Sequence, residues 1–248
     1  MPLPYPHYFP TSRMNRLLIA LVFAGGALCA LAASPANVPS RIEIKYRVSF
    51  GAMKIGEGLD IFQHDGKAYS VVSESKTAGL AAVIYQLNIR REAKGSVTAS
   101  GLRPASFVEQ RNGQVKRSAA FDWSANQVQL TDGDNKQTVA LPANTWDSTS
   151  FAWNFMFVPP EGKDIDLHLT DGRRVTPYRY AILGHEKLQT AMGEMDTLHV
   201  KKVQEEGDKR AFDVWLAVGR HHLPVRIRYT EKDGNAFDSL AESINLTP

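Results

Sequence analysis

The chain has 248 residues, of which 29 are Lys or Arg and 26 are Asp or Glu, so its formal net charge at pH 7 is +3. This near-balance of charge gives no electrostatic reason to expect a nucleic acid as a partner. A single cysteine, Cys29, excludes a disulfide framework and a cysteine-based zinc site.

The N-terminal segment, residues 1–33, has the pattern of a secretory signal peptide. Two arginines precede an apolar run over residues 17–31, and small residues follow that run. About 15 apolar residues are short for a membrane span, which needs roughly 20, although an uncleaved anchor is the alternative. We therefore predict export to the periplasm, cleavage near Ala32/Ala33, and no transmembrane span in the mature chain.

Two residues within this segment bear on its interpretation. Residues 1–13 are unlike the basic start of a signal peptide, which makes Met14 an alternative start of translation. Cys29 follows Leu28, where a lipoprotein signal requires a small residue. We expect Cys29 to be removed with the peptide, which leaves a mature chain without cysteine.

Residues 34–248 are expected to form a single periplasmic β-barrel-like domain. Over residues 41–50, apolar and polar side chains alternate with a period of two, which predicts a strand with one solvated face. The glycine-rich stretch from Gly51 to Gly58 is interpreted as a bend or bulge. Turn signals recur at the spacing of a barrel or sandwich. Further strands are predicted over 59–63, 68–75, 94–100, 105–111, 115–123, 126–132, 136–141, 164–170, 174–183, 185–191, 195–204, 210–218, 224–231 and 237–246.

One segment that departs from this period predicts a short helix near residue 80. Leu80, Val83, Ile84 and Leu87 recur at the spacing of one helical face, and Thr77 is the candidate N-cap.

A second helix is predicted over residues 147–158. Asp147 or Ser148 can accept hydrogen bonds from its first N–H groups, and Pro159 ends it. It is apolar nearly all round, so we expect it to be buried as a core plug or to form one wall of a cavity. Its apolar residues include Phe151, Trp153, Phe155, Met156 and Phe157.

Two histidine patterns were weighed as metal or ligand sites. His221 and His222 precede Pro224, which belongs at a strand start, so the pair is interpreted as a connection between strands. The alternative is a pH-sensitive or ligand-contacting histidine. A second pattern over residues 164–168 places Asp164, Asp166 and His168 on one strand face, where they could hold a cation. A solvated outer face explains it better, and we predict no metal site.

The arginines at the start of the strand after residue 224 have two interpretations. Arg226 and Arg228 share one strand face and could pair with Asp213 across the hairpin, which we favour. If they face inward instead, they could hold an anionic head group at the mouth of an apolar cavity.

No enzyme motif stands out from the sequence. A nucleophile elbow, a His-Glu-x-x-His helix and a phosphate-binding glycine loop are all absent from it. We therefore predict no catalytic residues and no cofactor. A hydrolase that acts on cell-envelope material is the least favoured hypothesis.

Several motifs follow one another along the mature chain: YRVSFGAMKIGEG at 46–58, SGLRPASF at 100–107, DSTS at 147–150, LGHEKLQTAMG at 183–193, FDVW at 212–215 and LPVRI at 223–227. In this order they resemble a bacterial periplasmic family known only as domain of unknown function 3108, over about residues 41–246. The resemblance implies a long antiparallel sheet that curls into an open or spiral β-barrel. That fold is similar to the periplasmic lipoprotein carriers of the Lol pathway, which hold acyl chains between a curled sheet and short helices.

Our leading functional hypothesis is a non-catalytic envelope protein that binds a lipid, a lipidated partner or another amphipathic ligand in an apolar cavity. The alternative is a scaffolding protein of the envelope, with a packed barrel and a protein partner. A cavity of roughly 300 Å³ or more favours the first, and a barrel filled by its own side chains favours the second. The candidate ligand-binding residues are Phe151, Phe155, Trp215, Arg226 and Arg228.

Overall fold

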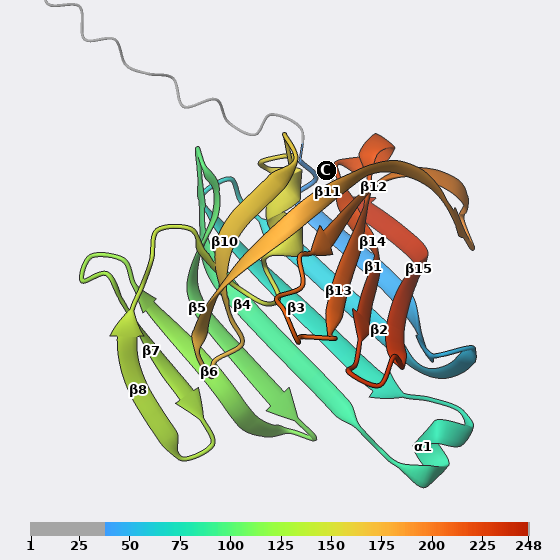
Figure 1. Cartoon of the computed structure of the whole chain (residues 1–248), viewed down its shortest axis with the longest axis horizontal. Helices are drawn as coiled ribbons and strands as arrows, with labels where there is room; N and C mark the ends of the chain where they lie inside the picture. Colours follow the sequence, from blue (N-terminus) through green and yellow to red (C-terminus); the bar gives the residue numbers. More distant parts are fainter. Residues whose placement is uncertain (1–37, 248) are drawn as a thin grey trace, which may run out of the picture. The chain divides into compact units, whose positions relative to one another are not determined.

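The computed structural model describes residues 38–247, and the predicted signal peptide over residues 1–33 lies outside them. All strands of the described part belong to one sheet of 15 strands (Figure 1). The elements in chain order are β1 (Arg41–Phe50), β2 (Met53–His64), β3 (Ala68–Thr77), α1 (Leu80–Ile84), β4 (Asn88–Thr98), β5 (Gly101–Arg111), β6 (Gln114–Asp122), β7 (Gln127–Asp132), β8 (Asn135–Ala140), β9 (Thr145–Asp147), η1 (Ala152–Met156), β10 (Asp164–Thr170), β11 (Val175–Thr190), β12 (Gly193–Lys202), β13 (Ala211–Ala217), η2 (Val218–Arg220), β14 (Leu223–Thr230) and β15 (Ala236–Thr247).

The sheet extends outward from its middle in both directions along the chain. β1 pairs with β2 on one side and with β15 on the other, so the first and last strands are neighbours at the centre. Every pair is antiparallel except β9 with β10. The two edge strands, β8 and β9, follow one another in sequence but do not pair, so the sheet curls without closing (Figure 1).

The predicted fold class is confirmed: the protein is mainly β, with a single curled antiparallel sheet and very little helix. The strands predicted over 41–50 and 164–170 coincide with β1 and β10. The strands predicted over 174–183 and 185–191 are in fact one strand, β11. Gly184, at φ 109°, lies at an irregularity in its pairing with β12 and lets the strand continue past it.

The predicted bend or bulge over Gly51–Gly58 is confirmed in part. Gly51 and Ala52 form a turn, and β2, which begins at Met53, is irregular in its pairing with β1, where Val48 lies opposite Gly56 but Ser49 lies opposite Lys54. Gly56 lies inside β2, where a Cβ atom would come within 2.5 Å of the carbonyl oxygen of Lys76 on β3. The glycine therefore allows two strands to approach closely and does not mark a turn.

The helical segment predicted over 147–158 is buried inside the curl of the sheet, as expected, but only Ala152–Met156 is helical and it is a 3₁₀ turn (Figure 1). The N-cap of η1 is Phe151, not Asp147 or Ser148, and it makes no side-chain capping bond, but the turn before η1 is held by Asp147. Its Oδ1 atom accepts hydrogen bonds from the backbone N–H groups of Thr149 at 2.9 Å and Ser150 at 2.8 Å. Burial raises the pKa of the Asp147 carboxyl, and these donors act against that effect.

The side chains of η1 are divided between the two halves of the sheet. Trp153 stacks on Phe62 of β2, with ring centroids 5.2 Å apart, and belongs to a cluster with β1 residues. Phe155 packs in a second cluster with Val214 of β13. Asn154 adds a polar contact, since its Oδ1 accepts the N–H of Leu102 on β5 at 2.8 Å. We define the inner face of the sheet as the face that contacts η1.

The helix predicted near residue 80 exists but is shorter, and its predicted N-cap is wrong. Gly79 occupies the N-cap position of α1 (Leu80–Ile84). Thr77 ends β3 instead, and its Oγ1 donates to the carbonyl of Tyr85 and accepts from the N–H of Leu87. Within residues 38–247, no helix is long and apolar enough to cross a membrane.

The histidine pair lies in the connection between β13 and β14, as predicted. His221 and His222 have φ values of 53° and 55°, so the chain turns through two consecutive left-handed residues. The N–H of His222 donates to the carbonyl of Ala217 at 3.0 Å, which closes the turn. Burial lowers the pKa of His222, and the nearby His185 and His221 contribute further.

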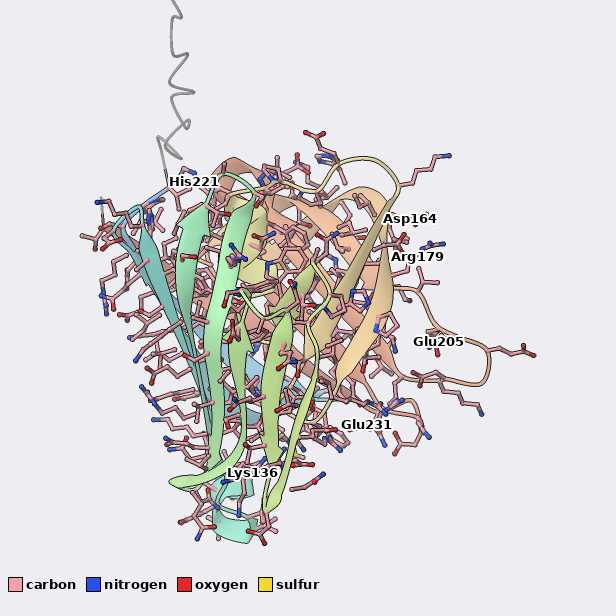
Figure 2. All side chains as sticks on the ribbon, turned by 90° about the vertical axis from the view of Figure 1, so that its left-hand side faces the viewer. Lys136, Asp164, Arg179, Glu205, His221 and Glu231 are labelled. Carbon is pink, nitrogen blue, oxygen red and sulfur yellow. The ribbon has the colours of Figure 1, made fainter. Side chains whose placement is uncertain are left out.

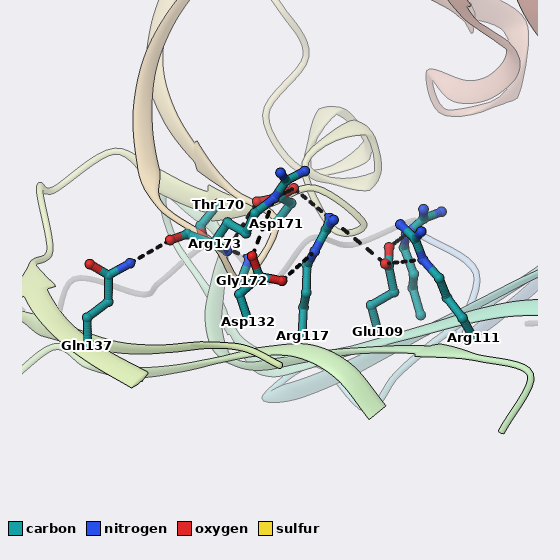
Figure 3. Close-up of polar contacts among 10 residues, drawn as sticks. Glu109, Arg111, Arg117, Asp132, Gln137, Thr170, Asp171, Gly172 and Arg173 are labelled. Atoms are coloured by element: carbon teal, nitrogen blue, oxygen red, sulfur yellow. Dashed lines mark hydrogen bonds and ion pairs between the residues drawn. The ribbon is translucent and has the colours of Figure 1, made fainter. Parts of the chain in front are cut away.

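Where no backbone hydrogen bonds close the curled sheet, side chains connect its two ends. The Nη1 atom of Arg117 on β6 donates to Asp171, in the turn between β10 and β11, at 2.9 Å (Figure 3). Gln137 on β8 donates to the carbonyl of Arg173 in the same turn at 2.7 Å. Gly172 at φ 88° is needed there, because a Cβ atom would lie 2.9 Å from the Cβ of Arg117. We call these contacts the seam.

The first prediction concerns the buried plug. Phe155→Ala removes a side chain that is 4% exposed, and we expect a loss of about 3–5 kcal/mol in the free energy of unfolding. The matched control is Phe237→Ala, because Phe237 is 39% exposed and should lose roughly 1 kcal/mol or less. Urea unfolding of both variants checks this expectation. Equal losses would show that η1 is not central to the fold.

Candidate functional site

An open groove of about 560 Å³ lies between β10, β11 and the chain that follows β12. Its apolar surface comes from Leu167, Tyr178 and Val203, and Arg179 and Glu205 stand at its rim. Figure 2 shows Arg179 and Glu205 on the same flank of the molecule. The complete lining is Ala143, Asn144, Asp166, Leu167, His168, Pro177, Tyr178, Arg179, Val203, Gln204 and Glu205.

The register of β10 and β11 explains this mixture of apolar and charged groups. Leu167 lies opposite Tyr178, and Asp166 lies opposite Arg179. Because successive side chains on a strand point to opposite faces, the first pair lies towards the core and the second towards solvent. Arg179 donates to both carboxylate oxygens of Asp166, at 2.7 and 2.9 Å, and this pairing lowers the pKa of Asp166. Lys202 lies 4.9 Å from the centre of the Tyr178 ring.

Two residues of the Asp164–Asp166–His168 pattern, Asp166 and His168, line this groove, but the three side chains do not form a metal site. Asp166 is held by Arg179, Asp164 is exposed, and His168 is half-buried. Over residues 38–247, no three His, Cys, Asp or Glu side chains are arranged to hold a metal ion. The Nδ1 atom of His168 is buried and has no hydrogen-bond partner among those same residues.

The candidate ligand-binding residues do not form one site, because the aromatic ones are divided between two core clusters. Phe151 and Phe155 are almost fully buried on the inner face, with ring centroids 5.2 Å apart. Trp215 is also buried, at 5% exposed, but it packs in the cluster that contains Trp153 and not in the cluster of the two phenylalanines. The structure therefore does not bring the two phenylalanines together with Trp215 and Arg226.

Trp215 and Arg226 do lie together. The guanidinium carbon of Arg226 is 4.6 Å from the centre of the Trp215 ring, and His199 stacks on the same ring at 4.3 Å. The Trp215 indole N–H donates to the carboxylate of Glu186. Arg228 is exposed and stands apart from this group.

The predicted ion pair between Asp213 and one of these arginines is wrong. Asp213 is bonded to His199 on the neighbouring strand β12, with 2.8 Å between Nε2 and Oδ1. Arg226 pairs with Asp238 on β15, on its other side, and its Nε lies 2.9 Å from Oδ1. Asp213 and Arg226 therefore each pair with the strand on the outside of the β13–β14 hairpin and not with each other's strand. The sequence of the hairpin alone does not show these outer neighbours.

A row of polar side chains that the sequence did not predict crosses the inner face. In register, each member lies opposite the next on the adjacent strand. Two positions away on each strand lies a buried apolar residue, such as Phe62 or Phe107. Because residues two apart on a strand point to the same face, the polar row also faces inward. The polar row consists of Asp60, Ser73, Arg91, Glu109, Arg117 and Asp132.

Acids and bases alternate along this row and compensate one another. Arg91 and Arg111 both donate to the Glu109 carboxylate, at 2.8 and 3.0 Å (Figure 3). Burial by itself raises the pKa of Glu109, but the two guanidinium groups outweigh it and the pKa is lowered. At the other end, burial raises the pKa of Asp60 to about 6, because Ser73 and Arg91 only partly offset it. The row continues through Arg117 into the seam.

The second prediction uses the buried carboxyl of Asp60. Its pKa of about 6 in the folded state exceeds the ordinary value of 3.8, so the native state binds the proton more tightly than the unfolded state. The resulting stabilisation is complete below about pH 4 and is lost as the pH rises through about 6. Relative to the wild type, Asp60→Asn should therefore gain about 2–3 kcal/mol between pH 4 and pH 7.

Urea unfolding of both proteins across this pH range measures that difference. Asp166→Asn is the control: because the pKa of Asp166 is lowered, its contribution is lost as the pH falls, which is the opposite trend. A stability difference for Asp60→Asn that stays constant with pH would contradict the prediction.

The fold has relatives among solved structures. A β-barrel-like protein of domain of unknown function DUF1849 from Brucella abortus superposes with a TM-score of 0.54 at 9% identity, covering 85% of this chain and 99% of that one. A candidate lipoprotein from Parabacteroides distasonis gives a TM-score of 0.38 at 10% identity, covering 84% and 97%. At such identities the first likeness concerns the fold alone.

No curated protein matches this chain. A family model does: residues 45–240 match the family described as protein of unknown function DUF3108, which is most of the part that forms the sheet. The chain therefore belongs to the DUF3108 family.

Proposed function

We propose that this protein is an exported, non-catalytic protein of the periplasm that binds a lipid or another amphipathic ligand in the groove beside β10 and β11. The groove carries the proposal. Its volume of about 560 Å³ lies in the range of small-molecule sites, which are lined mainly by apolar groups with a few polar ones. Export rests on the signal-peptide pattern of residues 1–33.

The groove provides separate surfaces for the two parts of an amphiphile. Tyr178 and Val203 offer an apolar surface to an acyl chain. Arg179 at the rim is paired with Asp166, but its side chain is 56% exposed and still offers a cation to a phosphate, and Glu205 offers a carboxylate to an amine. A rim with both charges suits a head group that also carries both.

This proposal places the ligand outside the centre of the curl. Phe151 and Phe155 are engaged with protein side chains, and Arg226 is engaged with Asp238. In the groove, by contrast, Val203 is 41% exposed and is available to a ligand without unfolding the core.

A scaffolding role is the second candidate, and one observation favours it. The space inside the curl is occupied by the side chains of η1, with Trp153 only 1% exposed and Phe155 4% exposed. A plugged sheet of this kind suits a rigid protein whose outer face meets an envelope partner.

Mass spectrometry of organic extracts tests the proposal directly. Protein purified from the periplasm should release a lipid or lipid-like molecule in near-stoichiometric amount, and protein refolded from denaturant should release none. Repeated absence of any amphiphile from the native preparation would favour the scaffolding role.

The third prediction assigns binding to the groove. Val203→Glu places a charge on its apolar surface, and we expect binding of a fluorescent lysophospholipid to weaken about tenfold. Leu246→Glu is the matched control, because Leu246 is also 41% exposed and does not line the groove. Fluorescence titration of the three proteins measures the effect. Equal affinities for the two variants would remove the groove from the account.

A further inference from the structure

The surface of α1 is unusually apolar for an exposed segment. Leu80, Val83 and Ile84 are 85%, 83% and 87% exposed, and Tyr85 is 62% exposed. From Ala78 to Tyr85 the sequence AGLAAVIY contains no charged side chain. Scattered exposed apolar residues are ordinary, but a contiguous cluster marks a contact surface. We call residues 78–87 the α1 tip.

Other exposed apolar side chains lie at the same end of the sheet. α1 connects β3 to β4 and projects beyond the neighbouring strands (Figure 1). Met53 begins β2 at this end, and it is 63% exposed. Phe237 is the second residue of β15 there, opposite Phe50, and Val115 is the second residue of β6. Apolar exposure is therefore concentrated at one end of the sheet.

Several backbone groups of the α1 tip are hydrogen-bonded within the protein. Thr77 joins its two ends, since its N–H donates to the carbonyl of Leu87 at 3.0 Å and its hydroxyl donates to that of Tyr85 at 2.9 Å. The N–H of Ala78 donates to Ile55 on β2 at 2.9 Å. Unpaired backbone groups are costly in hydrocarbon, so this internal pairing suits a segment that enters an apolar phase.

Charges and aromatic groups around the tip suit a lipid surface. Lys76 is exposed at the end of β3, which leads into the tip, and Lys54 is exposed at the start of the neighbouring strand β2, 3.4 Å from Glu57. Lysines beside an apolar segment contact anionic head groups, and tyrosine prefers the boundary between head groups and chains. A helix of five residues is too short for the i, i+3, i+4, i+7 face that docks in a protein groove.

We propose that the α1 tip inserts into the surface of a phospholipid bilayer. Leu80, Val83 and Ile84 enter the boundary between head groups and acyl chains, Tyr85 stays at head-group depth, and Lys76 contacts anionic head groups. The proposal does not depend on the groove at β10 and β11, which involves different elements. It gives the protein a fixed orientation on a membrane, with the end that carries α1 facing the lipid.

Flotation with vesicles of phosphatidylethanolamine and phosphatidylglycerol tests the proposal. The mature wild-type chain should float with the vesicles, and Val83→Asp with Ile84→Asp should bind them at least about tenfold more weakly. Leu183→Asp is the matched control, because Leu183 is 57% exposed on β11, away from the tip. Both variants change exposed positions, and unfolding curves confirm that each is folded.

A spectroscopic measurement distinguishes insertion from mere adhesion. Ile84→Cys labelled with an environment-sensitive fluorophore, on the mature chain, should show a blue shift when vesicles are added, and Leu183→Cys should show none. Binding that survives the double substitution, or absence of the shift at Ile84, would overturn the proposal. A third result would also overturn it: a wild-type protein that binds no vesicles but forms a dimer, which the double substitution dissociates. The tip would then contact a second copy of the chain. Vesicle binding by Val203→Glu should be normal, which separates this test from that of the groove.

Discussion

The structure depends on the burial of one short apolar segment inside a sheet that does not close. Because η1 contributes Trp153 to a cluster with β1 and β2 and Phe155 to a cluster with β13, it holds both halves of the sheet to one core. Asp147 makes this possible, since its buried carboxylate satisfies the first N–H groups of a segment that no strand can pair. Without the plug, the inner faces of the two halves would expose their apolar residues to water.

The polar contacts have a different role, because they set how far the sheet curls. The polar row meets the seam at Arg117, which contacts both Asp132 on β7 and Asp171 in the turn between β10 and β11. These side-chain contacts connect the two ends of the curled sheet, so the edge strands β8 and β9 need not pair. The groove beside β10 therefore lies close to the unpaired edge of the sheet at β9. The buried core next to the groove is unaffected by this gap in the strand pairing.

Sequence periodicity predicted the fold well, because alternation over residues such as 41–50 and 164–170 directly reflects which face is buried. It could not predict the groove, since Leu167 and Val203 are brought together only by the order of strands. The polar row was hidden for the same reason: Asp60 and Glu109 gain their meaning from pairing across strands. Helical spacing near Leu80 was also recognised, but spacing does not tell whether an apolar face packs on protein or stays exposed.

The central claim is that an amphipathic ligand binds beside β10 and β11 and leaves the plugged interior unchanged. Methyl NMR during titration with lysophosphatidylethanolamine tests it most directly, because leucine and valine probes lie in both places. We expect the methyl signals of Val203 to shift while those of Leu198 and Val214, which pack with the plug, do not. Shifts confined to Leu198 and Val214, or no shifts at all, would contradict it.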